Sequence, residues 1–129
     1  RRIRVSGRRS MADCLFATGI PFLGRGSAET DAKFLQELNA VMQASSGVRR
    51  FGAAALDLAF LAAGRYDGFW DRGLSVWDIA AGVLIVREAG GLVSDFASRD
   101  KALESGDVVA CNSAMHASLL KTLRSANAS

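Results

Sequence analysis

The sequence predicts an α/β layered domain, with a central mixed sheet flanked by helices on both faces. The chain has 129 residues and is 50% hydrophobic. Short apolar runs alternate along it with segments of helical spacing, and glycine or serine separates them. A chain of this length buries one ordinary core. Alternating strands and helices favour a sheet that helices cover on both sides. We therefore expect a single domain over residues 1–129.

Six segments have the composition of strands. The first alternates polar and apolar residues, which is typical of a half-buried strand, and the second is a short apolar run that glycine and proline follow. Two further glycines, at 24 and 26, predict a loop after it. The six expected strands are 2–6, 14–18, 48–51, 68–70, 92–96 and 108–111.

Four segments have the periodicity or composition of helices. The second of them is almost entirely apolar, so we expect it deep in the core. Polar residues that favour helix starts lie at Thr30 or Asp31, at Asp78 and at Ser113. The expected helices are 31–44, 52–63, 78–89 and 113–123.

The sequence argues against a membrane-spanning or secreted protein. No apolar run approaches the roughly 18 to 20 residues of a membrane span, and no apolar stretch typical of a signal peptide follows the basic start. These observations predict a cytoplasmic protein. Cys14 and Cys111 show no CxxC spacing and have apolar neighbours, which predicts two buried free thiols.

The formal net charge is +3, and five arginines crowd the first nine residues. One interpretation is a solvated strand edge and loop. The other is a patch for phosphate or RNA, although no aromatic residue is interleaved with these arginines to stack on bases. An RNA- or protein-binding assembly module that uses this segment is therefore the alternative function. The arginines are Arg1, Arg2, Arg4, Arg8 and Arg9.

Several residues with catalytic potential lack a suitable setting. His116 has no carboxylate or cysteine at a suggestive spacing. The glycines of 24–26 lack the third glycine and the preceding strand of a dinucleotide loop. Asp57 and Glu88 fall within helices, where we expect structural carboxylates.

One segment does point to chemistry. Asp78 lies at an expected helix start between a tryptophan and a run of small residues. Helix capping alone explains such an aspartate. However, Asp71 lies seven residues earlier, and Gly52 begins another helix whose free N–H groups can bind oxyanions.

The segments around these residues follow a recognisable order. WDIAAG at 77–82 is followed by EAGG at 88–91 and LVSD at 92–95, and is preceded by RRFGAAALDLA at 49–59 and GRYDGFW at 64–70. Over essentially its whole length the sequence resembles the inositol monophosphatase family, and the bacterial branch fits best. The resemblance implies the C-terminal half of that fold.

The resemblance also implies roles for individual residues. Asp78 holds one magnesium ion (Mg2+) and contacts the substrate, and Trp77 packs behind it. Asp71 accepts a hydrogen bond from a sugar hydroxyl, although many relatives have glutamate there. The other implied substrate-binding residues are Arg49, Gly52, Ala53 and Ala54. No catalytic residue is assigned within this chain.

Two acidic motifs of the family, Gly-Glu-Glu and Asp-Pro-x-Asp-Gly-Thr, have no counterpart in the sequence. Magnesium prefers six oxygen ligands, and two-metal phosphate chemistry needs several carboxylates. We therefore expect that the N-terminal metal-binding half is absent and that the chain alone is inactive.

The implied activity of the intact protein is hydrolysis of a phosphate monoester, with inositol 1-phosphate as the default substrate. Fructose 1,6-bisphosphate and adenosine 3′,5′-bisphosphate, the substrates of related branches, stay open. The resemblance further implies a homodimer, a sugar- or inositol-phosphate partner and no membrane contact.

Overall fold

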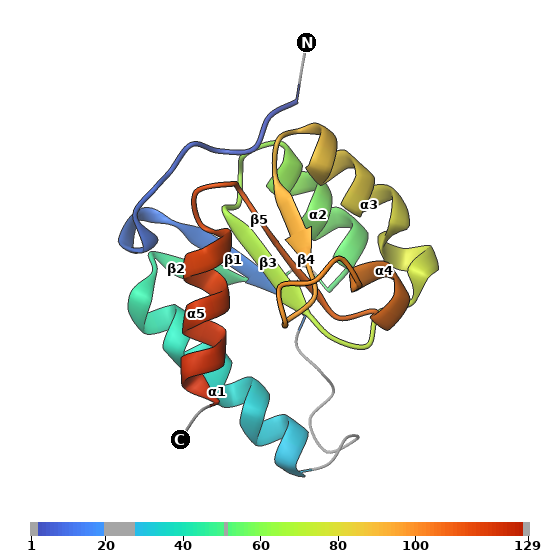
Figure 1. The fold of residues 1–129 in the computed structure, drawn as a ribbon. Coiled ribbons are helices and arrows are strands. Elements are labelled where there is room, and N and C mark those ends of the chain that lie inside the picture. Colours follow the sequence, from blue (N-terminus) through green and yellow to red (C-terminus); the bar gives the residue numbers. More distant parts are fainter. Residues whose placement is uncertain (1–2, 20–27, 51, 128–129) are drawn as a thin grey trace.

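The computed structural model describes residues 3–19, 28–50 and 52–127. Within these ranges it shows one five-stranded sheet in the order β2-β1-β3-β5-β4 (Figure 1). β1 pairs in parallel with β2 and β3, whereas β5 pairs antiparallel with β3 and β4. The predicted mixed sheet is thus confirmed. The strands are β1 (Leu15–Thr18), β2 (Gly47–Arg49), β3 (Gly68–Asp71), β4 (Leu92–Ser94) and β5 (Val108–Cys111).

Helices cover both faces of the sheet, as the sequence predicts (Figure 1). α2 and α3 pack against each other on one face, and α1 and α5 pack on the other. The short helix α4 and the 3-10 turn η1 were not expected from the sequence. The helices are η1 (Met11–Asp13), α1 (Ala28–Ala44), α2 (Ala54–Ala62), α3 (Val76–Glu88), α4 (Ala102–Ser105) and α5 (His116–Ala126).

The core is divided by the sheet into two clusters. Successive strand residues point to opposite faces. In β3, Phe69 accordingly joins the cluster under α2 and α3, and Trp70 joins the cluster under α1 and α5. Both cysteines are buried and free, which confirms that prediction. No helix in the described ranges is long and apolar enough to cross a membrane.

The strand predicted at 2–6 is wrong over its described residues. Residues 3–6 are irregular, and the Val5 N–H donates a hydrogen bond to the Ala89 carbonyl, 3.0 Å, outside any strand ladder. The alternation arises because Val5 packs against the α2–α3 cluster while its polar neighbours do not. The segment is fixed farther on, where Ser6 and Arg8 bond the buried carboxylate of Asp67.

The predicted helix caps also need correction. α1 already includes Ala28, so Thr30 and Asp31 lie inside its first turn, where the helix dipole favours an acidic residue. α3 has Ser75 as its N-cap, and Asp78 is its third residue. Sequence cannot separate these positions well, because polar residues are favoured in the whole first turn as well as at the cap.

The last helix begins later than predicted. α5 starts at His116, and Ser113 makes no cap bond to it. Instead, the side-chain oxygen of Asn112 accepts a hydrogen bond from the Met115 N–H, 2.9 Å. The loop expected around residues 24–26 and the last residue of the strand expected at 48–51 lie outside the described residues.

Candidate active site

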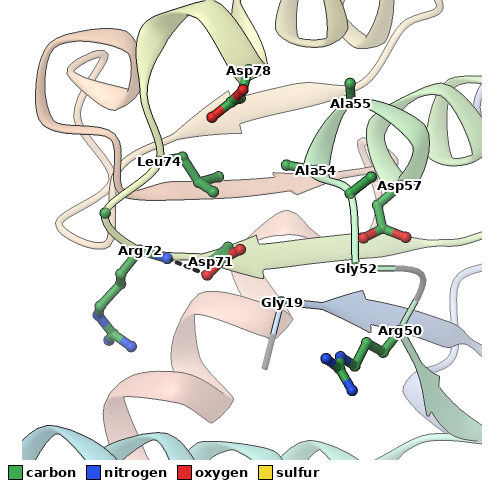
Figure 2. Close-up of a pocket in the computed structure, with 12 residues that line it drawn as sticks. Gly19, Arg50, Gly52, Ala54, Ala55, Asp57, Asp71, Arg72, Leu74 and Asp78 are labelled. Carbon is green, nitrogen blue, oxygen red and sulfur yellow. Dashed lines mark hydrogen bonds between the residues drawn. The ribbon is translucent and has the colours of Figure 1, made fainter. Parts of the chain in front are cut away.

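A cavity lies where the parallel strands end. Gly19 follows β1, Arg50 follows β2, and Asp71 is the last residue of β3. Ligands of open α/β sheets bind outside the carboxyl ends of such strands. The cavity measures ≈590 Å³, within the range of small-molecule sites. Its lining residues are Gly19, Arg50, Gly52, Ala53, Ala54, Ala55, Asp57, Asp71, Arg72, Gly73, Leu74 and Asp78 (Figure 2).

The Asp71 carboxylate is held in a fixed direction at this edge. Its Oδ1 accepts a hydrogen bond from the Arg72 N–H, 2.8 Å. A Cβ atom added to Gly19 would lie only 2.1 Å from its Oδ2, so the carboxylate occupies space that any other residue at 19 would fill. Burial raises the pKa of Asp71 from 3.8 to about 6, against the opposing effect of Arg72. Asp71 is therefore an oriented acceptor that ionises below neutral pH.

Asp78 reaches the cavity from the first turn of α3 (Figure 2). Its Oδ2 accepts a hydrogen bond from the Ser75 hydroxyl, 2.8 Å, and the residue is exposed. A carboxylate at this position is favoured by the helix dipole. It also remains open to a cation, because carboxylate oxygens have further lone pairs after one hydrogen bond.

The start of α2 presents backbone to the cavity. Gly52, Ala53 and Ala54 line it and precede or begin the helix. The first N–H groups of a helix have no intrahelical acceptor, and they attract anions and hydroxyl oxygens. The alanine side chains are small, so a ligand can come close to these groups.

Asp57 is a residue of the cavity that sequence reasoning set aside. It lies in the first turn of α2, is 1% exposed, and its Oδ1 has no hydrogen-bond partner in the described structure. Burial and the charge of Asp71 raise the pKa of Asp57 from 3.8 to about 6. The sequence did offer one signal: a single charged residue in an otherwise apolar helix.

Five of the six predicted substrate-binding residues come together here: Gly52, Ala53, Ala54, Asp71 and Asp78. Arg49 ends β2 and does not line this cavity, whereas Arg50 does. Consecutive residues of an extended chain point in opposite directions, which accounts for the difference. Gly19, Arg72 and Leu74 also line the cavity without having been predicted. Strand order places Gly19 beside Asp71, whereas Arg72 and Leu74 follow Asp71 along the chain.

The predicted packing of Trp77 behind Asp78 is wrong in this structure. Trp77 is 92% exposed. The inward row of α3 consists of Ile79, Val83 and Val86, and Trp77 lies on the outward face. Residues two positions apart on a helix do not share a face.

Comparison with known proteins decides the family. The sequence model of the inositol monophosphatase family matches residues 1–128. The chain belongs to the inositol monophosphatase family. It is 53% identical over 124 residues to an inositol-1-monophosphatase of Mesorhizobium japonicum, covering 96% of this chain and 46% of that protein. It is 49% identical over 124 residues to the Nus factor SuhB of Pseudomonas aeruginosa, covering 96% of this chain and 45% of that protein.

Solved inositol monophosphatase-family structures share the fold. The extragenic suppressor protein suhB of Bartonella henselae superposes with a TM-score of 0.89 at 47% identity, covering 96% of this chain and 47% of that one. The inositol monophosphatase of Anabaena superposes at 0.84 and 35% identity, covering 97% of this chain and 50% of that one. The chain thus spans about half the length of the relatives it matches.

The residues of this inositol monophosphatase-family chain fit only part of a magnesium site. The carboxylate of Asp78 is the hard oxygen ligand that magnesium prefers. In residues 3–19, 28–50 and 52–127, however, no group of three histidine, cysteine or acidic side chains converges to hold a metal ion. Asp78 therefore offers one suitable oxygen ligand, and the described residues do not form a complete magnesium site.

Proposed function

We propose that this chain is the C-terminal half of a magnesium-dependent phosphatase that hydrolyses a phosphate monoester, with inositol 1-phosphate as its substrate. One observation carries the proposal: Asp78 of the family signature and the carboxylate of Asp71 line the same cavity as the start of α2. A polyol phosphate needs hydroxyl acceptors, anion-binding N–H groups and a metal ligand, and these residues supply one of each.

Each residue then has a distinct part in binding. Asp71 accepts a hydrogen bond from a ring hydroxyl, since its carboxylate is ionised at neutral pH and the Arg72 N–H fixes its direction. The backbone at Ala53 and Ala54 binds substrate oxygens at the mouth of α2. Asp78 contributes an oxygen to the metal site. Magnesium, when bound, supplies Lewis-acid polarisation of the phosphoryl group and an activated water.

The remaining metal ligands and the groups that orient the attacking water belong, in this proposal, to a further half of the family fold. The apolar outer faces of α2 and α3 support the existence of such a partner. Leu56 is 43% exposed, Leu84 57% and Trp77 92%. A patch of this kind on paired helices is typical of a protein–protein contact. In this proposal the further half packs there, which covers Trp77 and brings its carboxylates beside Asp78.

The test compares the chain alone with a completed protein. The 129-residue chain should release no phosphate from inositol 1-phosphate, with or without magnesium. Joined to the part of the Mesorhizobium japonicum relative that it does not match, it should show magnesium-dependent release. Turnover by the isolated chain equal to that of the completed protein would contradict the proposal.

Two variants of the completed protein test the residue roles. Asp78→Asn should lower kcat/KM by at least roughly 100-fold, because it replaces a metal ligand. Even mutation of the residues that hydrogen-bond to metal ligands lowers metal affinity or activity roughly 10- to 100-fold. Asp71→Asn should mainly raise KM, by about tenfold, because it weakens one hydrogen bond to a charged acceptor. Asp100→Asn, on an exposed side chain remote from the cavity lining, is the matched control.

A second candidate function has a specific observation in its favour. The Pseudomonas aeruginosa relative is named a Nus factor, which fits the RNA- or protein-binding module that the arginine-rich start predicts. Of those arginines, Arg4 and Arg9 are exposed, while Arg8 is paired with Asp67. Titration of the chain into RNA at rising salt tests this role, since phosphate contacts give a steep loss of affinity. An affinity independent of salt would exclude it.

A further inference from the structure

The segment between β3 and α3 carries both acidic residues of the proposed site. Asp71 ends the strand, Asp78 lies in the first turn of the helix, and residues 72–75 between them are irregular. Without anchors such a connection samples many conformations. Two carboxylates that serve one ligand must nevertheless keep a fixed separation. What holds residues 72–75 therefore decides the geometry of the site.

One side of this segment is fixed by backbone. The Gly73 N–H donates to Asp107 Oδ1, 3.0 Å, and the Leu74 N–H donates to the Gly106 carbonyl, 3.0 Å. These bonds attach the segment to the turn before β5. They leave its other side, at Arg72, to be held by side chains.

The Arg72 side chain forms an ion pair with Glu37 on the face of the sheet that α1 and α5 cover. Its Nη1 and Nη2 donate to Glu37 Oε1 and Oε2, both at 2.6 Å. Glu37 is fully buried in α1. Its Oε2 also accepts a bond from Asn127 Nδ2 at the end of α5, 2.7 Å. The Arg72 guanidinium lies 3.8 Å from the centre of the Phe96 ring. A bidentate pair with further partners on both members has one geometry.

We infer that Glu37 and Arg72 are positioning residues of the active site: their ion pair holds the segment that carries Asp71 and Asp78. The link to the cavity is direct, because the N–H of the same Arg72 residue donates to Asp71 Oδ1. Figure 2 shows the Arg72 side chain directed away from Asp78 while its backbone meets the Asp71 carboxylate. A shift of the guanidinium therefore moves the amide that orients Asp71. The consequence for catalysis rests on the proposed function.

An ion pair on a buried carboxylate can also be purely structural, and the experiment must separate the two roles. The Glu37 side chain is fully buried and that of Arg72 is 34% exposed. Removing one partner of such a pair destabilises the whole fold, whereas replacing both by apolar residues of similar size is often neutral for stability. Glu37→Gln and the double variant Glu37→Met with Arg72→Met are therefore compared. Asp100→Asn, which breaks the exposed pair with Arg87, is the control.

Amide hydrogen exchange in the 129-residue chain measures local and global opening together. Exchange of the Arg72 and Gly73 amides should accelerate by at least about tenfold in both Glu37 variants. Without the ion pair, the segment that contains these amides opens locally more often. In the double variant the β5 amides of 108–111 should regain the protection of the original chain. If Arg72 and Gly73 regain protection together with β5, the pair is only structural and the inference fails.

Kinetics of the completed protein give the functional readout. The double variant should raise KM for inositol 1-phosphate by about tenfold, the same shift as loss of the Asp71 contact, with a smaller change in kcat. An unchanged KM in a well-folded double variant would overturn the positioning role. If the completed protein proves to have no phosphatase activity, the proposed function fails, while the exchange measurement still decides whether the ion pair holds the segment.

Discussion

The two helical layers of this protein differ in the polarity of their solvent-exposed faces. α1 and α5 bury one apolar stripe each, and their outer faces are largely polar, with Leu35 and Met42 as exposed exceptions. α2 and α3 are apolar on both faces. Their inner faces join the core, and Leu56, Trp77 and Leu84 stand exposed on the outer ones. One layer is an ordinary surface, whereas the other has the composition of an interior.

The two layers also differ in whether their buried carboxylates have hydrogen-bond partners. In α1, both oxygens of Glu37 are bonded to Arg72. In α2, Oδ1 of Asp57 has no partner within the described structure and lines the candidate active site. On the α1–α5 side the buried acid is paired within the chain, whereas the α2–α3 side combines exposed apolar side chains with a buried carboxylate oxygen that has no partner among the described residues.

The largest expected effect is at the seam between α2 and α3. A Cβ atom on Gly82 would lie 2.8 Å from the Cβ of Leu58. Gly82→Val should lower the free energy of unfolding by about 3 kcal/mol, because neither helix backbone can move away cheaply. Ala81→Val, one residue away on the exposed face, is the control. Urea unfolding of both variants measures the difference. Equal decreases in the free energy of unfolding would show that α2 and α3 are not tightly packed at Gly82.

An intermediate effect is expected on the outer face of the same layer. Trp77→Ser should weaken binding of the unmatched part of the Mesorhizobium japonicum relative by at least about 30-fold, since buried tryptophans are frequent anchors of interfaces. It should change the stability of the isolated chain by less than about 0.5 kcal/mol. Met42→Ser on α1 should affect neither quantity.

Calorimetric titration measures the affinity, and sedimentation of the chain alone measures self-association. Equal effects of the two substitutions would remove the distinction between the layers. A chain that dimerises through Trp77 and does not bind the added half would instead favour the homodimer that the family resemblance predicts.

The smallest effect is the pH dependence at Asp57. Burial and Asp71 raise its pKa from 3.8 to about 6 in the folded chain. Between these values the folded state keeps a proton that the unfolded state has lost, so stability falls as pH rises through this window. Asp57→Asn removes this loss. The free energy of unfolding of the variant, relative to that of the original chain, should therefore rise by about 2 kcal/mol between about pH 4 and pH 7. Urea unfolding at both values measures it, and a constant difference would mean that Asp57 is solvated or bonded.

The sequence predicted more of the fold than of the site's surroundings. Within the described residues, all five strands and four of the five α-helices were expected, because apolar periodicity and breaking glycines mark them. Residues 3–6 were misassigned since alternation also occurs where a single valine packs on a core. α4 was missed because four residues are too few to show a helical period.

Sequence alone determined the family and predicted which residues bear chemistry: the aspartates at 71 and 78 and the small residues at 52–54 stand in the order of the family's motifs. Tertiary structure alone decided what surrounds them. Strand order brings Gly19 and Arg50 to the same edge as Asp71, the ion pair across the sheet ties Arg72 to Glu37, and helix phase turns Trp77 outward. The physical reason is that local pattern reports the burial of each segment, whereas contacts between segments depend on their pairing and orientation, which no local pattern encodes.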